Sequence, residues 1–442
     1  MPPAVGAVPA TEFELVAMLA TAAGRYTSTV PAPTDQPPEN VIILLVAVAT
    51  GVALASRWAR APYTVALVLA GLVLGALHVI AAPHLTKQLV FAVFLPGLVF
   101  EAALHLRYAD LKRDSAAILG LAVPGVGIAL ALTATVLVGA SNLLGLADAF
   151  HWQQALVFAS LIAATDPIAV VALFRTLGAP ARLTMLLEAE SLVNDGTAIV
   201  FFGLVLTATG GAGVGAPALM LEFARVVGIG VVVGGGLGYL LCQATRRIDE
   251  PMVEITLTTI AAYGSFALAD QLGGSGVIAT VVAGLLCGDY GAKVAMSSAT
   301  RSAVEAFWGY AAFLLNSIVF LLIGFEVRVS ALMASLPLIL VAIVAVLVAR
   351  FVVVGGVSVA AAPTAHRIPT RWIVPLTWGG LRGALSMVLA LSLPDDFAGR
   401  ALVVTTTFGV VVVSIVVQGV TMSPLLRRLR LIETDPTGGT AT

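Results

Sequence analysis

Long apolar stretches separated by short polar turns follow one another along most of this chain. Each stretch is close to the roughly 20 apolar residues that an α-helix needs to cross a bilayer. The pattern predicts thirteen membrane helices, near residues 41–57, 63–81, 86–106, 115–141, 152–176, 184–208, 218–245, 250–269, 274–289, 303–325, 331–356, 370–393 and 400–425. The glycine-rich entrance of the ninth stretch, at 273–276, predicts a tilted or irregular start for that helix.

The two ends of the chain differ from the part between them. Residues 1–40 are rich in Pro, Ala and Thr. Their apolar part, 15–23, is too short to span a membrane, and no basic region precedes it as in a signal peptide. We therefore predict a mostly disordered extracytoplasmic tail over 1–40, a transmembrane domain over 41–425 and a short cytoplasmic tail over 426–442.

Composition supports a membrane protein. Of the 442 residues, 59% are apolar and 11% are charged, whereas a soluble domain is about 45–50% apolar and about 25% charged. The net charge of -1 and the lack of a basic cluster argue against nucleic-acid binding. Two cysteines, Cys242 and Cys287, are too few for a disulfide framework or a zinc site. The chain is thus expected to be a multi-pass integral membrane protein and not a soluble enzyme.

The basic residues between the predicted helices indicate the orientation. Sixteen of the 23 Lys and Arg residues lie on one side of the membrane if alternate loops are grouped, and five lie on the other. Cytoplasmic loops carry the excess of positive charge. The C-terminus is therefore predicted to be cytoplasmic and the N-terminus to lie outside, in a cell membrane.

Six ionisable residues lie within the predicted helices. A charge in the membrane costs free energy and usually marks a functional site. The six are Glu101, Asp166, Glu190, Asp195, Arg350 and Arg382.

Asp195 and Asp166 are expected at a similar depth. A helical rise of about 1.5 Å per residue puts Asp195 about 16 Å from the cytoplasmic end of its helix, in the middle of a core of about 30 Å. Ser191 lies four residues before Asp195 and shares its face, and Glu190 and Asn194 form a second such pair. Oxygen ligands of this kind suit a hard cation, with no cofactor implied. The alternative is that these polar groups only hold helices together.

Two of the predicted helices carry an interruption. Pro167, in the stretch 152–176, removes a backbone donor and frees carbonyl groups one turn earlier. The stretch 370–393 contains Gly379-Gly380-Leu381-Arg382-Gly383. These are the fifth and twelfth helices, and an odd offset of seven gives them opposite orientations, as in an inverted repeat of two six-helix halves. Glycines for close packing are the alternative.

The two arginines need partners within the membrane. Arg350 and Glu190 are predicted at matching depths on their helices, which makes them a plausible ion pair. Arg382, at mid-membrane, is placed to stabilise free carbonyl groups and helix dipoles at the second interruption.

Four sequence segments together resemble the monovalent cation:proton antiporters of the CPA1 type, the NhaP/NHE-like sodium/proton exchangers. They are Thr165-Asp166-Pro167, Glu190-Ser191-Leu192-Val193-Asn194-Asp195-Gly196, Gly379-Gly380-Leu381-Arg382-Gly383-Ala384 and Phe94-Leu95-Pro96-Gly97-Leu98-Val99-Phe100-Glu101. The resemblance covers about residues 41–425. It implies an all-α fold of about thirteen helices, two inverted repeats, crossed broken fifth and twelfth helices, and a homodimer.

The resemblance also assigns roles to residues. It implies that Asp195 carries the cation and the proton, and that Ser191, Thr165 and Glu101 complete the cation site. By the same resemblance, Asn194 and Asp166 form a supporting polar pair, and Glu190 with Arg350 forms a structural ion pair. Asn194 before Asp195, in place of a second Asp, resembles the electroneutral branch of the family.

This assignment agrees with the chemistry of a buried carboxyl group. Desolvation disfavours its charged form, so such a group can hold a proton near neutral pH, while a bound sodium ion favours the charged form. One site that binds either ion is the core of an antiporter, so we expect exchange of Na⁺, or of K⁺ or Li⁺, for H⁺ by alternating access. The chain is then a secondary transporter and not an enzyme.

Three other functions fit the sequence less well. A cation channel would need a selectivity filter, and no filter-like loop is present. An intramembrane aspartyl protease would use Asp166 and Asp195, but its typical motifs have only poor counterparts at 286–289 and 108–110. A transporter of organic anions would need more basic groups within the membrane.

Overall fold

The computed structural model describes residues 38–59, 62–77, 87–145, 150–210, 215–246, 248–292, 296–363 and 367–432. These residues form helices and short connections and no strand. Of the predicted N-terminal tail, 1–37 lie outside the described residues and the last three belong to the first described helix. Of the predicted C-terminal tail, 433–442 lie outside them.

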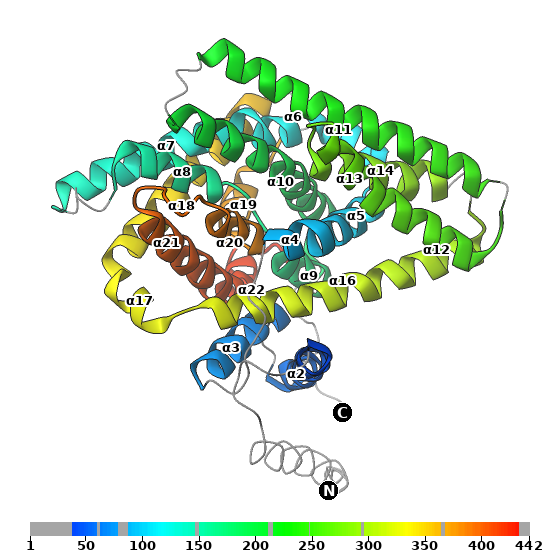
Figure 1. Ribbon diagram of the computed structural model, residues 1–442, viewed down its shortest axis with the longest axis horizontal. Helices are drawn as coiled ribbons and strands as arrows, with labels where there is room; N and C mark the ends of the chain where they lie inside the picture. The colour runs from blue at the N-terminus through cyan, green and yellow to red at the C-terminus, as the bar shows by residue number, and fades with distance from the viewer. Residues whose placement is uncertain are drawn as a thin grey trace, which may run out of the picture.

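Helical elements occur at each apolar stretch predicted from the sequence (Figure 1). The first half contains α2 (Pro38–Ala59), α3 (Tyr63–Ala76), α4 (Lys87–Leu89), η1 (Val90–Phe94), α5 (Leu95–His105), α6 (Tyr108–Ala122), α7 (Pro124–Leu143), α8 (Trp152–Leu161), α9 (Ile168–Leu177), α10 (Ala181–Thr209) and α11 (Ala216–Thr245). The second half contains α12 (Pro251–Thr259), η2 (Ile260–Gly264), α13 (Ser265–Gln271), α14 (Gly276–Leu285), η3 (Leu286–Gly291), α16 (Ser298–Glu326), α17 (Val329–Ala334), α18 (Leu336–Ala361), η4 (Thr370–Trp372), α19 (Ile373–Trp378), α20 (Ala384–Leu391), α21 (Arg400–Val413), η5 (Ser414–Gln418) and α22 (Gly419–Arg428).

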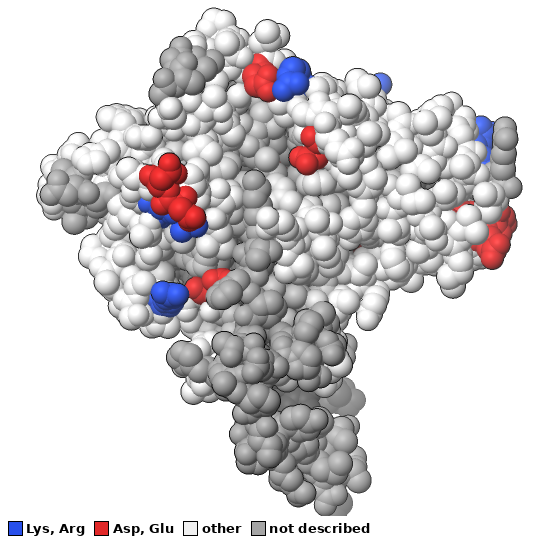
Figure 2. Space-filling model, in the orientation of Figure 1, with Lys and Arg blue, Asp and Glu red and all other residues white. Residues whose placement is uncertain are grey.

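The described helices are suited to a membrane. Within the described residues, seven helical stretches are long and apolar enough to cross one. The number that do cross it stays a prediction. Large apolar side chains also face outward, as on α11, where Met220 is 74% exposed and Val232 is 73% exposed. Most of the described surface drawn in Figure 2 is formed by uncharged residues, with charged side chains in a few separate spots.

Several helices differ in detail from the predicted ranges. The fourth predicted stretch, 115–141, belongs to a longer run that begins at Tyr108 and divides at Val123, just before Pro124. Pro124 cannot donate a backbone hydrogen bond and is tolerated at a helix start, which explains the division there. The ninth helix has the irregular entrance that its glycines predicted: Gly273 has a φ of 72°, and α14 starts at Gly276 behind a capping Ser275.

Helices α3 and α16 pack with their backbones in contact. A Cβ atom at Gly71 would overlap the carbonyl oxygen of Leu321, and one at Gly324 would overlap the carbonyl oxygen of Val68. Small residues allow helices within a membrane to approach this closely. Tyr63 adds a hydrogen bond of 2.7 Å between its hydroxyl and that of Ser317. This packing fixes α16 against α3.

Candidate functional site

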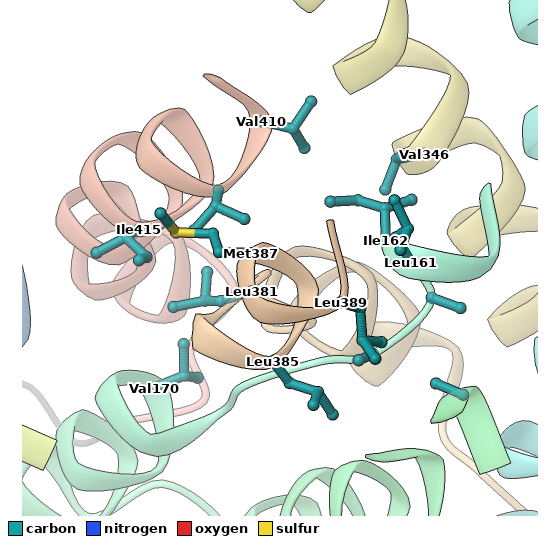
Figure 3. Packing of buried hydrophobic residues seen from close by; sticks show 14 of the residues in the cluster. Leu161, Ile162, Val170, Val346, Leu381, Leu385, Met387, Leu389, Val410 and Ile415 are labelled. Carbon is teal, nitrogen blue, oxygen red and sulfur yellow. The ribbon is translucent and has the colours of Figure 1, made fainter. Parts of the chain in front are cut away.

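Two helices of the structure are interrupted, and their interruptions lie side by side. Residues 162–167 separate α8 from α9, and residues 379–383 separate α19 from α20. The backbone N–H of Asp166 donates a hydrogen bond of 2.8 Å to the carbonyl oxygen of Leu381, which joins them directly. Figure 3 shows the extended segment between Ile162 and Val170 running along the helix that carries Leu385 and Leu389. Buried apolar side chains from both helices hold this arrangement together.

Arg382 satisfies the carbonyl groups that the first interruption leaves free. Its guanidinium donates hydrogen bonds of 2.8 Å to the carbonyl oxygen of Ala163 and 3.2 Å to that of Ala164. The backbone N–H of Arg382 donates to the hydroxyl of Ser414, at 3.0 Å. Arg382 is 5% exposed. The sequence placed Arg382 at the free carbonyl groups of its own interruption, but the carbonyl groups that it binds belong to the other interrupted helix.

Two side chains of α10 bind the same interruption. Ser191 donates a hydrogen bond of 2.5 Å to the carbonyl oxygen of Thr165. The amide of Asn194 donates to the carbonyl oxygen of Ala163, at 3.0 Å, and to the hydroxyl of Thr165, at 3.1 Å. The middle of α10 is thereby fixed to the backbone between α8 and α9.

Asp166 has a different partner from the one expected. No hydrogen bond joins it to Asn194 in the described part of the chain, because the amide of Asn194 is engaged by Ala163 and Thr165. Instead, a carboxylate oxygen of Asp166 accepts the N–H of Ile168, at 3.2 Å, where α9 begins after Pro167. Such a bond satisfies one of the free donors at a helix start. The expected polar pair is thus replaced by two separate contacts to the interrupted backbone.

A cavity of about 320 Å³ lies against this part of α10. Its polar lining combines carboxylate, hydroxyl, amide and guanidinium side chains, from Glu101, Thr165, Asp166, Arg175, Glu188, Ser191, Asp195 and Asn316. Asp195 is partly exposed there, and its Oδ1 atom is buried without a hydrogen-bond partner among the described residues. Glu101 enters from α5, and one of its oxygens lies 3.3 Å from Nδ1 of His105. The cavity therefore brings together Asp195, Ser191, Thr165 and Glu101, the four residues to which the family resemblance assigns the cation site.

Glu190 faces away from this cavity and binds Arg350. The guanidinium of Arg350 donates two hydrogen bonds to the carboxylate of Glu190, of 2.8 and 2.6 Å, and one of 3.2 Å to the carbonyl oxygen of Leu376. Both side chains are buried. A Cβ atom at Gly380 would lie 2.9 Å from Nε of Arg350, so the glycine makes room for the guanidinium. Gly379 ends α19 and leaves similar room for Leu187.

Three residues of the cavity do not stand out in the sequence. Asn316 is a polar residue in the middle of α16, and a lone Asn in an apolar helix usually serves packing. Glu188 and Arg175 lie near helix ends, where charges are ordinary, and they form an ion pair with hydrogen bonds of 2.9 Å. The position of Glu188 could still have been inferred from its spacing. It precedes Ser191 by three residues and Asp195 by seven, which puts all three on one helical face.

Comparison with known proteins agrees with this architecture. The sequence model described as "Sodium/hydrogen exchanger, transmembrane" matches residues 42–428. The Na(+)/H(+) antiporter ApNhaP of Aphanothece halophytica is 38% identical over 396 residues, which cover 88% of this chain and 74% of that protein. The low-affinity Na(+)/H(+) antiporter NhaS1 of Synechocystis sp. is 40% identical over 383 residues, which cover 85% of this chain and 71% of that protein.

A solved structure shows the same fold. The sodium proton antiporter MjNhaP1 of Methanocaldococcus jannaschii superimposes with a TM-score of 0.72 over 89% of this chain and 98% of that one, at 20% sequence identity. The match supports the all-helical membrane architecture expected from the sequence. The sequence matches show that the chain belongs to the transmembrane sodium/hydrogen exchanger family.

Proposed function

We propose that this protein exchanges Na⁺ for H⁺ across a membrane, with the two ions competing for the carboxyl group of Asp195. As a member of its family the protein is a secondary antiporter and not an enzyme, and it needs no cofactor. The observation that carries the assignment to Asp195 is its unpartnered Oδ1 beside a cavity to which carboxylate, hydroxyl and amide side chains contribute. A buried carboxylate oxygen without a protein donor is satisfied by a proton, a water molecule or a cation, and a cation is the partner that its negative charge favours most.

Competition for one carboxyl group explains why two fluxes are coupled. A proton neutralises Asp195 in one half of the cycle, and a cation neutralises it in the other. The empty, charged carboxylate is the form that crosses least readily, because an uncompensated charge in an apolar site costs several kcal/mol. Asp195 therefore crosses with either a cation or a proton bound, so movement of one ion in one direction requires movement of the other ion in the opposite direction. Alternating access of the cavity to the two sides completes the cycle.

The neighbouring oxygen atoms are proposed as the remaining cation ligands. Ser191 lies one helical turn before Asp195 and is bonded to the carbonyl oxygen of Thr165, so these groups form one cluster. Glu101 adds a second carboxylate from α5. Asp166, Asn194 and Pro167 act in support, because they shape the interruption from which Thr165 reaches the site. Oxygen ligands of this kind suit a hard monovalent cation.

Glu190 and Arg350 are proposed as a structural pair that carries no transported ion. Each is the main charged partner of the other, and their two hydrogen bonds use both carboxylate oxygens. Arg382 is proposed to stabilise the first interruption through its bonds to Ala163 and Ala164. Gly379 and Gly380 are proposed to make the second interruption possible, because they leave room for Leu187 and Arg350. These groups therefore set the shape of the site while Asp195 changes its ligand.

The setting of the site is also a proposal. We assign the transmembrane antiporter domain to residues 41–425 in a cell membrane, with an extracytoplasmic N-terminal tail and a cytoplasmic C-terminus. The support is the excess of basic residues in alternate loops. The inverted repeats and the homodimer rest on the family resemblance.

The exchange is proposed to be electroneutral. One cation replaces one proton on a single carboxyl group, and the residue before it, Asn194, is neutral and bonded to the backbone. The other two carboxylates of α10 are paired, Glu190 with Arg350 and Glu188 with Arg175, so neither is free to gain or lose charge with Asp195. The resemblance of Asn194-Asp195 to the electroneutral branch of the family also supports this stoichiometry.

The test is a proton-gradient assay with the purified protein in proteoliposomes. Added Na⁺ should dissipate an imposed proton gradient, and K⁺ and Li⁺, tested one by one, give the selectivity. Because the ions compete, a lower pH on the cation side should raise the apparent KM for Na⁺. Cation movement without counter-moving protons would instead indicate a channel.

A further inference from the structure

One helical face of α16 lines the ion cavity. The residues that it contributes are Gly309, Ala312, Phe313, Asn316 and Val319. Their spacing of three and four residues is that of a single helix face. Asn316 is the polar side chain in this otherwise apolar stripe. The stripe therefore brings one oxygen-bearing group to the cavity from a helix other than the one that carries Asp195.

The side-chain oxygen of Asn316 has no protein partner among the described residues. Its Oδ1 atom is buried and accepts no hydrogen bond from them. A buried amide oxygen without a donor is unfavourable, and the usual remedy is a donor, a water molecule or a cation. The cavity that this residue shares with Asp195 is the space from which such a partner can come.

The helix that carries Asn316 is firmly fixed. The next residue, Ser317, bonds the hydroxyl of Tyr63 on α3, at 2.7 Å, and donates to the carbonyl oxygen of Phe313, at 2.5 Å. The ring of Tyr63 stacks on that of Phe313, with centroids 5.5 Å apart. The amide is thus presented from a rigid helix, which a ligand position requires more than a packing position does.

We propose that Asn316 is a specificity-determining residue, whose amide oxygen contacts the cation in the cavity once the ion has shed part of its water. The proposal rests on Asp195 being the ion site. An amide oxygen is a neutral ligand for hard cations, as carbonyl oxygens are in many cation sites. Being neutral, it strengthens cation binding without adding a second group that takes up the proton. Asn316 therefore tunes which cation competes well with H⁺.

Two variants of nearly the same shape test the role of the oxygen. Asn316→Leu removes the oxygen, and Asn316→Asp keeps one in the same place. We expect Asn316→Leu to raise the apparent KM for Na⁺ about tenfold, the effect of losing one favourable polar contact. Its maximal rate should change little and its Na⁺-to-Li⁺ preference should shift. Asn316→Asp should still bind Na⁺ more tightly than Asn316→Leu does, but the pH dependence of its Na⁺ KM should differ from that of the wild type, because the new carboxyl group also takes up a proton.

Ser317→Ala is the matched control. It removes the bond to Tyr63 at the neighbouring position, but Ser317 does not line the cavity. It should lower the thermal stability and shift the Na⁺-to-Li⁺ preference much less than Asn316→Leu does, because the amide oxygen is retained. Asn316→Leu with an unaltered KM and ion preference would overturn the proposal. So would a loss of stability with all cations affected alike, because that is the result of a packing role. Asp195→Asn, assayed in parallel, shows separately whether the ion site itself is assigned correctly.

Discussion

The backbone N–H of Asp166 donates a hydrogen bond of 2.8 Å to the carbonyl oxygen of Leu381 and so joins the two interrupted helices of the site. The contact needs close approach, because the side chain of Asp166 lies directly against Gly383. Interrupted helices leave free donors and acceptors that nothing in an apolar membrane can satisfy. In this protein, each interruption supplies partners for the other, and Arg382 supplies two more hydrogen bonds.

Gly383→Ala should therefore impair exchange without unfolding the protein. A Cβ atom at this position would overlap Cβ and Oδ2 of Asp166, so the two interruptions must move apart. A displacement of about 1 Å in a site can lower a rate on the order of 100-fold. The measurement is Na⁺-driven proton flux in proteoliposomes, together with the thermal stability in detergent.

Gly356→Ala is the control for that variant. Gly356 lies within α18, and a Cβ atom added there would meet no neighbouring atom within 4 Å. Exchange should stay normal, and the better helix propensity of alanine favours a stability change of up to about 1 kcal/mol in the stabilising direction. Normal flux in Gly383→Ala would show that the close approach to Asp166 is not needed for transport.

Asp195→Asn should abolish exchange while leaving the fold intact. An amide has nearly the shape of a protonated carboxyl group, but it neither releases a proton nor provides a negative charge for the cation. Asp195→Glu should keep part of the activity with an altered Na⁺ KM, because the carboxylate is retained on a longer side chain. The assay is cation-driven proton flux, with thermal stability as the check on folding. Flux at the normal rate in Asp195→Asn would rule out Asp195 as the shared site.

Much of this site could be predicted from the sequence because charges in apolar helices are rare. Glu190 and Arg350 could be paired from their similar predicted depth in the membrane, and two hydrogen bonds join them in the structure. The interruptions at Pro167 and around Gly380 were also foreseeable, since proline and glycine act on their own backbone. These predictions needed only the residue type and its place along a regular helix.

Contacts that depend on which neighbouring helix a side chain points toward were not predictable in this way. Asn194 was expected to pair with Asp166, yet its amide binds Ala163 and Thr165, because the interruption exposes those groups nearer to α10. Asn316 is one polar residue in a long apolar run, and only the packing of α16 against α3 turns it toward the cavity. Tertiary packing determines the partners of Asn194 and the orientation of Asn316, and no local sequence pattern indicated either of them.

Electroneutral exchange predicts a rate that does not respond to the membrane potential. One Na⁺ replaces one H⁺ on Asp195, so no net charge crosses in a full cycle. Proteoliposomes with an imposed potential of either sign should show the same initial rate of Na⁺-driven proton movement. A control without the protein corrects for passive leak. A rate that follows the potential steeply, or a steady transport current on a supported membrane, would contradict one-for-one exchange.

The ion pair of Glu190 and Arg350 should stabilise the fold more than an exposed pair does. Removing one partner leaves the other as an uncompensated buried charge, which typically costs about 3–5 kcal/mol. Glu190→Ala and Arg350→Ala should each lower thermal stability and yield, and the double variant should lose less than the sum of the two. The exposed pair of Arg301 and Glu305, 2.8 Å apart, is the control, and Arg301→Ala should change stability by less than about 1 kcal/mol. If the two single losses simply add in the double variant, Glu190 and Arg350 are not energetically coupled, and Arg382 becomes the next candidate partner for Glu190.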